Sequence, residues 1–217
     1  MTTILNISTF VGLLALTFLS CGQTTSQPQV NQSSNRSQAD PCDNPDADIH
    51  CCFINMPSAL TSTMTIAQRD EPGDKLVITG TIYKADGRTP YPHVILYAYH
   101  TDSKGYYSKK GTETGVQKWH GHLHGWCKTD DKGFYKIQTI RPARYPDNSM
   151  PAHIHAAIQT DNGQMFWITD YVFKDDNLVD KKYLSYLTNV GGTGVVEVNK
   201  TSENSWFGMR DIILKNK

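Results

Sequence analysis

The chain has 217 residues, and its 21 basic and 21 acidic residues give a formal net charge of zero at pH 7. This length suits one domain with a substantial core. The balanced charge, with no basic stripe and no long run of like charge, argues against a nucleic-acid-binding protein.

The N-terminal segment is apolar. Residues 4–19 form a nearly unbroken apolar run, short for a membrane span, which predicts a signal peptide. The run ends in Leu-Ser-Cys-Gly, and a small residue followed by Cys21 resembles the lipobox of bacterial lipoproteins. That resemblance implies a signal peptide over residues 1–21, acylation of Cys21, and an exported protein held by lipid on the periplasmic or cell-surface side of a membrane. The alternative is an ordinary signal peptide in which Cys21 is incidental.

Residues 22–55 are predicted to separate this signal from the folded domain. Up to about Asp40 they are rich in Gln, Ser, Thr and Asn, which predicts a flexible tether because such a segment has few apolar side chains to bury. A cysteine-bearing stretch follows. An oxidising compartment and spacings unlike those of a zinc ribbon favour disulfides. Four cysteines allow three pairings, and all three remain open; the residues concerned are Cys42, Cys51, Cys52 and Cys127.

The folded domain is predicted to cover residues 56–217 and to consist mainly of short strands. The strands are expected where β-branched and aromatic residues concentrate between turn residues: residues 76–83, 94–99, 125–140 as one hairpin, 153–159 and 164–173 as a second hairpin, 193–199 and 209–215. One short helix is expected within residues 176–187. This pattern predicts an all-β fold, an antiparallel β-sandwich whose long loops carry the functional site.

The segment Pro-Ala-His-Ile-His at residues 151–155 contains the strongest candidate for a metal site. Alternate side chains of a strand point to the same face, so His153 and His155 would present two imidazoles side by side. That arrangement suits chelation of one metal ion. Two histidines on one strand face also occur without a metal, and from these two residues alone both interpretations stand.

Two tyrosines lie in loops that could face the same place. Tyr145 precedes Pro146 in the sequence Arg-Pro-Ala-Arg-Tyr-Pro, which predicts a stiff, extended loop just before the histidine pair. Tyr107 lies in Gly-Tyr-Tyr-Ser, a turn that follows the strand expected at 94–99. Taken singly, each is typical of an ordinary half-buried tyrosine.

Together and in this order, the segments resemble the intradiol ring-cleaving dioxygenases, the family of protocatechuate and catechol dioxygenases. The family pattern is a G-x-Y turn, a T-D-x-x-G-x-Y-x-F-x-T-I-x-P stretch, a Y-P pair and then P-A-H-I-H. The corresponding segments here are residues 105–107, 129–142, 145–146 and 151–155. The resemblance extends from about residue 77 to residue 214, which is most of the predicted domain.

This resemblance implies an Fe(III) cofactor held by Tyr107, Tyr145, His153 and His155. Two phenolate ligands suit Fe(III) better than Fe(II), which other oxygenases hold with a carboxylate and two histidines. The resemblance also implies the reaction, in which a small aromatic diol of the catechol type is opened with O₂ to a muconate-type diacid. The residue matching Tyr145 leaves the metal and takes up a substrate proton, so Tyr145 would be both ligand and catalytic base.

The sequence departs from the family pattern at two positions near these ligands. Met150 stands where the family has an arginine, for which Arg141 or Arg144 could substitute, and Asp170 stands in the strand where the family has a glutamine. The N-terminal helices that carry dimer contacts in cytoplasmic members are absent from the pattern, and a homo-oligomer remains open. The loss of the family arginine at Met150 favours a second interpretation, a membrane-tethered transthyretin-like sandwich that binds iron or a catechol-type ligand without opening rings.

The stretch Trp-His-Gly-His-Leu-His-Gly-Trp contains His120, His122 and His124 at alternate positions. In an extended chain all three would share one face. The favoured interpretation is a polar loop around the pocket, in which a histidine could contact the substrate. The alternative is a second metal site, and with it a third hypothesis for the whole protein, that of a zinc protein.

Overall fold

The structure is a computed structural model, and it describes residues 39–203 and 205–215. The predicted signal peptide, Cys21 and residues 22–38 of the predicted tether lie outside the described residues. Within the described ranges, no helix combines the length and the apolar character needed to cross a bilayer.

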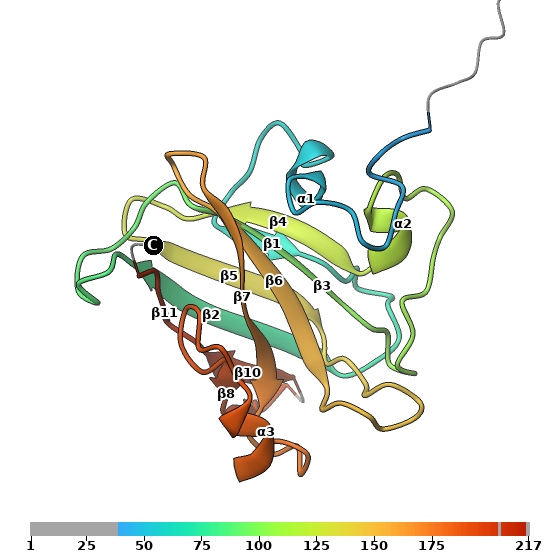
Figure 1. Cartoon of the computed structure of the whole chain (residues 1–217). Helices are drawn as coiled ribbons and strands as arrows, with labels where there is room; N and C mark the ends of the chain where they lie inside the picture. Colours follow the sequence, from blue (N-terminus) through green and yellow to red (C-terminus); the bar gives the residue numbers. More distant parts are fainter. Residues whose placement is uncertain (1–38, 204, 216–217) are drawn as a thin grey trace, which may run out of the picture. The chain divides into compact units, whose positions relative to one another are not determined.

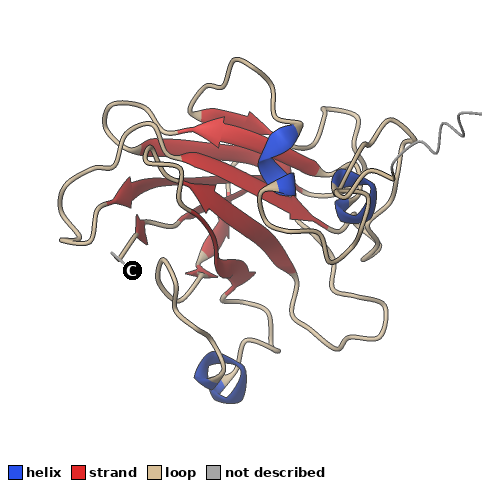
Figure 2. Cartoon of the chain, turned by 45° about the horizontal axis from the view of Figure 1, so that its top comes forward, coloured by secondary structure: helices blue, strands red, loops and turns tan. Residues whose placement is uncertain are grey.

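Two sheets form the centre of the domain (Figure 1). The first has the order β1–β5–β2–β10–β9, with β11 also paired to β2: β1 Thr63–Thr65, β5 Phe134–Ile140, β2 Lys75–Tyr83, β10 Trp206–Met209, β9 Val198–Lys200 and β11 Ile212–Ile213. The second has the order β4–β3–β6–β7–β8: β4 His124–Lys128, β3 Ile95–His100, β6 His153–Gln159, β7 Met165–Phe173 and β8 Val195–Val196. The helices are short and lie in the connecting loops (Figure 2).

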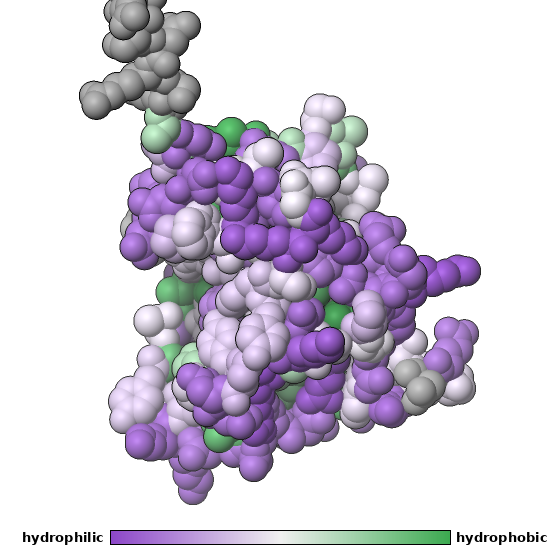
Figure 3. Space-filling view, turned by 90° about the vertical axis from the view of Figure 1, so that its right-hand side faces the viewer, coloured by the Kyte–Doolittle hydropathy of each residue, from purple (hydrophilic) through white to green (hydrophobic). Residues whose placement is uncertain are grey.

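The core forms where the inward faces of the two sheets meet. Residues of β2 alternate between buried and half-buried, as expected for a strand with one face in the core. The fully buried side chains from both sheets form one cluster, which includes Ile78, Ile137, Leu96, Ile154 and Ile158. Hydrophilic residues cover most of the molecular face drawn in Figure 3. The all-β sandwich that the sequence predicts is therefore confirmed.

The pairing is mixed, although the sequence predicts an antiparallel sandwich. β2–β5, β3–β4, β3–β6, β6–β7 and β9–β10 are antiparallel. Parallel pairs join β1 to β5, β10 and β11 to β2, and β8 to β7. These parallel neighbours are strands of two to four residues near the ends of the domain, added to the edges or the ends of longer strands.

The hairpin predicted for residues 125–140 is wrong, because β4 and β5 belong to different sheets. The turn between them bonds to a different strand on each side. Thr129 exchanges hydrogen bonds with Val94 at the start of β3, whereas the carbonyl of Gly133 accepts from the N–H of Ile82 in β2. The turn thus carries the chain from one sheet to the other. The hairpin predicted for β6 and β7 is confirmed by their antiparallel register.

The elements predicted after residue 175 differ from the observed ones in their bounds. Helix α3 covers Lys181–Ser185, fewer residues than the predicted 176–187, with the side chain of Asp180 accepting from the N–H of Tyr183 at its start. The strand predicted at 193–199 is divided between β8 and β9, which lie in different sheets. The strand predicted at 209–215 is also divided, since Met209 ends β10, which begins at Trp206, and β11 covers only Ile212 and Ile213.

The folded domain begins earlier than the predicted residue 56. Helix α1, Cys51–Ile54, buries Cys51, Cys52 and Phe53 against the outer face of the second sheet. A disulfide joins Cys42 to Cys51, while Cys52 and Cys127 are free, buried thiols. Residues 41–55 are therefore part of the domain and not of a tether, because they supply apolar side chains that cover Tyr97.

Candidate metal centre

The two predicted histidine ligands lie on β6, in the middle of the second sheet. His153 and His155 point to its outer face, while Ile154 between them is fully buried in the core. β6 is paired on both sides, with β3 and with β7. A strand held on both edges gives the two imidazoles a fixed backbone, so their separation does not depend on a loop.

The two predicted tyrosine ligands come from loops that contact each other. Tyr107 lies in the loop between β3 and α2, Gln117–His120, and Tyr145 lies in the loop between β5 and β6. The hydroxyl of Thr101 donates to the carbonyl of Ala143 at 2.7 Å. At Gly105 the backbone φ is +87°, and a Cβ there would lie 2.0 Å from a carbonyl oxygen of the second loop. A glycine is therefore required where the two loops meet.

The four side chains converge on one point. The Oη atoms of Tyr107 and Tyr145 are 2.8 Å apart, and Tyr145 Oη is 3.2 Å from Nε2 of His153. The Nε2 atoms of His153 and His155 are 3.0 Å apart, and His155 Nε2 is 3.0 Å from Tyr107 Oη. The four donor atoms therefore form a closed ring, each within 3.2 Å of the next. Ligand bonds of about 2 Å place neighbouring donor atoms of one metal ion at about this spacing.

The hydrogen bonds of the imidazoles identify which nitrogens face this point with a lone pair. Nδ1 of His153 lies 2.7 Å from the carbonyl oxygen of Pro151, and Nδ1 of His155 lies 3.0 Å from a carboxylate oxygen of Asp170. Both partners are acceptors, so both Nδ1 atoms carry the proton. The two Nε2 lone pairs then face each other at 3.0 Å, an arrangement that a cation between them stabilises.

The ionisation of these groups agrees with a bound cation. Burial lowers the pKa of His153, and the neighbouring His155 lowers it further, so the ring is neutral and able to act as a ligand. Burial and the hydrogen bond with Tyr145 raise the pKa of Tyr107. A phenolate forms at this site near neutral pH only when a strong positive charge compensates for the burial. Two imidazoles and two phenols therefore fit a ferric ion.

Asp170 reaches His155 because β7 contains a bulge. Ile154 pairs with Tyr171 and Ala156 with Ile168, so two residues of β7, Thr169 and Asp170, lie opposite the single residue His155. The extra residue leaves the core positions on both sides in phase and directs the Asp170 side chain toward the imidazole. A carboxylate behind a ligating histidine fixes its tautomer and raises its basicity.

A protein-family model, Dioxygenase_C, described as Dioxygenase, matches residues 51–207. The chain belongs to the intradiol ring-cleavage dioxygenase family. Its catechol 1,2-dioxygenase relative from Acinetobacter baylyi (strain ATCC 33305 / BD413 / ADP1) is 32% identical over an alignment of 108 residues, and the match covers 42% of this chain. The chain matches 34% of the length of that curated relative.

Solved structures of intradiol dioxygenases share the fold. The enzyme from Tetranychus urticae gives a TM-score of 0.56 at 18% identity, over 74% of this chain and 89% of that one. Catechol 1,2-dioxygenase from Acinetobacter sp. ADP1 gives 0.54 at 21% identity, over 72% and 57%. The dioxygenase domain from Streptomyces sp. SirexAA-E gives 0.55 at 18% identity, over 75% and 93%. At these identities the likeness establishes the fold alone.

The family has an arginine at the position of Met150, and neither Arg141 nor Arg144 is free to replace that arginine in this chain. Both nitrogens of the Arg141 fork bond the carboxylate of Asp175, at 2.7 and 2.9 Å. Arg144 pairs with Asp176, whose side chain is 4% exposed. Both guanidiniums thus stabilise the loop that carries Tyr145, and the suggestion that either substitutes at Met150 is not supported.

The three alternating histidines do not share one face. His120 ends α2 and its Nδ1 is 2.7 Å from the hydroxyl of Tyr97; His122 Nε2 is 3.0 Å from Glu71; and His124 in β4 donates to the carbonyl of Gly121. Among the described residues, no group close enough to hold a metal includes any of them. Their contacts are structural, and the helix and the turn at Gly121 explain why the expected alternation fails.

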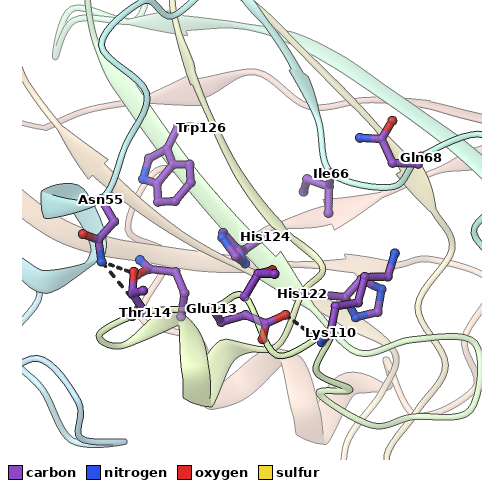
Figure 4. A pocket seen from close by; sticks show the side chains of 11 residues that line it. Asn55, Ile66, Gln68, Lys110, Glu113, Thr114, His122, His124 and Trp126 are labelled. Carbon is purple, nitrogen blue, oxygen red and sulfur yellow. Dashed lines mark hydrogen bonds between the residues drawn. The ribbon is translucent and has the colours of Figure 1, made fainter.

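His122 and His124 help to line a cavity of about 360 Å³ beside α2. Figure 4 shows both rings together with Trp126 and Glu113 around this space. None of the four predicted metal ligands lines it. The polar loop that the sequence predicts around the pocket thus borders a second space, separate from the four converging side chains.

An aromatic layer beside the centre is not singled out by the sequence motifs. The ring of Tyr99 stacks on His155 at a centroid distance of 4.7 Å and on His120 at 3.7 Å. Trp167 meets Tyr99 edge to face at 6.3 Å. A strand whose outward positions are aromatic, as Tyr97 and Tyr99 are in β3, is the sequence feature that could have indicated this layer.

Proposed function

We propose that this protein is a non-haem Fe(III) intradiol dioxygenase that opens a catechol-type aromatic diol with O₂ to a muconate-type diacid. The observation that carries the proposal is the closed ring of Tyr107, Tyr145, His153 and His155, with both Nε2 lone pairs aimed at its centre. Membership of the family supports the choice of iron over other metals. In the reaction both atoms of O₂ enter the product, and no further reductant is consumed.

In this proposal the bound ferric ion supplies a Lewis-acid centre that binds the diol and activates its ring toward O₂. In this proposal His153 and His155 are the two ligands whose positions are fixed by β6. Tyr145 acts as the base, and its oxygen accepts a proton from a diol hydroxyl. Tyr145 lies on a loop and is half-buried, whereas the hydrogen bond of Asp170 fixes the ring of His155.

The test is a visible spectrum with metal analysis, recorded before and after addition of catechol. We expect iron-loaded protein to be burgundy, from phenolate-to-iron charge transfer, and the absorption to shift when catechol binds. Oxygen uptake with formation of a muconate then establishes ring opening. Protein that remains colourless and does not bind added ferric ion would refute the proposal, and bound iron without ring opening of any diol would indicate a binding protein.

We also propose that the protein is exported and anchored to a membrane through acylated Cys21. Support comes from the apolar run before Ser20 and Cys21, and the disulfide between Cys42 and Cys51 agrees with an oxidising compartment. Cell fractionation of full-length protein should place it with membranes, and Cys21→Ser should release it. A Cys21→Ser protein that stays in the membrane fraction would refute acylation at this position.

A further inference from the structure

The candidate centre is open to solvent along β7. The residue His153 is 4% exposed, but the side chains of His155 and Asp170 are 23% and 26% exposed. Trp167, three residues before Asp170 on the same strand, is 42% exposed. Of the two histidines, His155 is therefore the more accessible, and Asp170 and Trp167 are exposed on the same side of the centre. A substituent of a diol bound at the four candidate ligands would meet solvent on this side.

The charge on this side is negative. The carboxylate of Asp170 is 26% exposed, and one of its oxygens lies 3.0 Å from Nδ1 of His155. No lysine or arginine of the described chain forms an ion pair with Asp170. Arg141 and Arg144, on the adjacent loop, are paired with Asp175 and Asp176. A carboxylate without a cationic partner attracts a positive substituent and repels a negative one.

The exposed indole of Trp167 also favours a positive charge on the substituent of the substrate. The face of an indole ring attracts a cation within about 6 Å of its centre, more strongly than other aromatic rings do. Among the described residues, the cation–π contacts of Lys and Arg involve Tyr91, Trp119, Phe173, Trp206 and Tyr171, and none involves Trp167. Trp167 meets Tyr99 edge to face, and Tyr99 stacks on His155, so one aromatic ring connects the indole to the centre.

We propose that the Asp170 and Trp167 side chains make the site selective for catechols that carry a cationic side chain, an ammonium group above all, over catechols that carry a carboxylate. The inference rests on the proposed function, since it requires a diol to bind at the ring of four ligands. Asp170 thus has two contacts to make, a hydrogen bond from His155 through one oxygen and an electrostatic contact with the substituent of the substrate.

The test compares three catechols whose substituents at ring position 4 begin with the same two-carbon chain and end in an ammonium, a hydrogen or a carboxylate: 4-(2-aminoethyl)catechol, 4-ethylcatechol and 3-(3,4-dihydroxyphenyl)propanoate. Anaerobic titration of the iron-loaded protein, followed through its visible absorption, gives a dissociation constant for each without turnover. Oxygen uptake then gives kcat/KM. We expect the ammonium compound to be preferred over the carboxylate by at least about tenfold in both measurements, with the ethyl compound between them.

Asp170→Asn keeps an acceptor for Nδ1 of His155 and removes the charge, so the preference should fall at least about threefold. The ratio between substrates is the readout because it cancels any general effect of the variant on the iron. The matched control is Asp161→Asn, a carboxylate in the turn at the far end of β6 that accepts from the hydroxyl of Tyr91; its ratio should equal that of the unmodified protein.

Equal or stronger binding of the propanoate would overturn the inference, as would an unchanged ratio in Asp170→Asn, while ring opening of 4-ethylcatechol would leave the proposed function intact. If none of the three catechols shifts the spectrum or is opened, the proposed function fails, and the selectivity falls with it.

Discussion

His153 and His155 occupy the same face of β6, but different groups hold their rings. A backbone carbonyl fixes His153, whereas the carboxylate of Asp170 fixes His155. A carboxylate partner makes an imidazole the stronger donor to a metal. As the proposed ligands, the two histidines would therefore be unequal donors, because Asp170 bonds Nδ1 of His155 whereas a backbone carbonyl bonds Nδ1 of His153.

Tyr107→Phe should lower the affinity for ferric ion by more than about tenfold, because the variant removes one of four converging donors and loss of even an outer partner of a ligand costs ten- to a hundredfold. Its charge-transfer absorption should weaken or shift. Metal titration followed in the visible range measures both. The matched control is Tyr106→Phe, since the neighbouring Tyr106 is 56% exposed and should leave iron binding unchanged. Full colour and affinity in Tyr107→Phe would exclude it as a ligand.

At the scale of elements, two of the four proposed ligands lie on β6, a strand paired on both sides, and the other two lie in loops. The loop of Tyr145 is stabilised by Asp176, which accepts from Arg144 and from the N–H groups of Ala152 and Leu178. The contact with Ala152 lies directly before β6. Asp176 therefore connects the loop that carries Tyr145 to the strand that carries His153 and His155.

Asp176→Asn should destabilise the protein by about 2 kcal/mol, because hydrogen bonds to a charged group contribute about 1.5–3 kcal/mol each and the amide retains some of them. Burial alone would raise the pKa of Asp176, but the hydrogen bonds from Arg144 and the two N–H groups lower it below its ordinary value. The stabilisation is then complete above the unfolded pKa of about 4 and is lost as the pH falls toward the folded pKa.

Thermal denaturation of both proteins between pH 7 and pH 3 measures this difference, which should shrink below about pH 4. Asp175→Asn is the control, since the side chain of Asp175 is 47% exposed and an exposed pair contributes about 0–1 kcal/mol. A difference that is constant down to pH 3 would show that the charge of Asp176 is not the cause.

Individual elements show what the sequence could predict. β2, β3 and the hairpin of β6 and β7 follow from alternation and turn residues, which act locally. Residues 125–140 have the same local features, but their pairing depends on β2 and β3, which are distant in sequence. The grouping of Tyr107 and Tyr145 with the histidine pair follows from the order of motifs. The direction of Asp170 does not, because a bulge changes which face a residue occupies.

At the scale of the molecule, two contacts join parts that are far apart in the chain. Arg210, between β10 and β11 of the first sheet, donates to the carbonyl of Thr169 in the bulge at 2.8 Å, and its guanidinium lies 4.0 Å from the centroid of Tyr171. The segment of residues 41–55 makes the second contact, through Phe53, which packs against Tyr97 of β3. Both contacts stabilise the second sheet, one from its inner side and one from its outer side.

Replacing Cys42 and Cys51 together with Ser should lower the free energy of unfolding by about 2–3 kcal/mol, as expected for loss of a short closed loop. Thermal denaturation with and without dithiothreitol measures this effect. The reductant should lower the melting temperature of the unmodified protein and leave that of the double variant unchanged, since Cys52 and Cys127 are free thiols. Equal sensitivity of both proteins to the reductant would exclude a stabilising role for this disulfide.

The bulge in β7 has a consequence for how this family can diversify. Because the additional residue is absorbed between Ile168 and Tyr171, both of these stay in the core. Substitutions at Thr169 or Asp170, or the gain or loss of one residue there, can change the surroundings of His155 while the sandwich keeps its register. Homologues that differ here should fold alike yet differ in the diols they accept, so this short stretch is the place to look for substrate divergence among related chains.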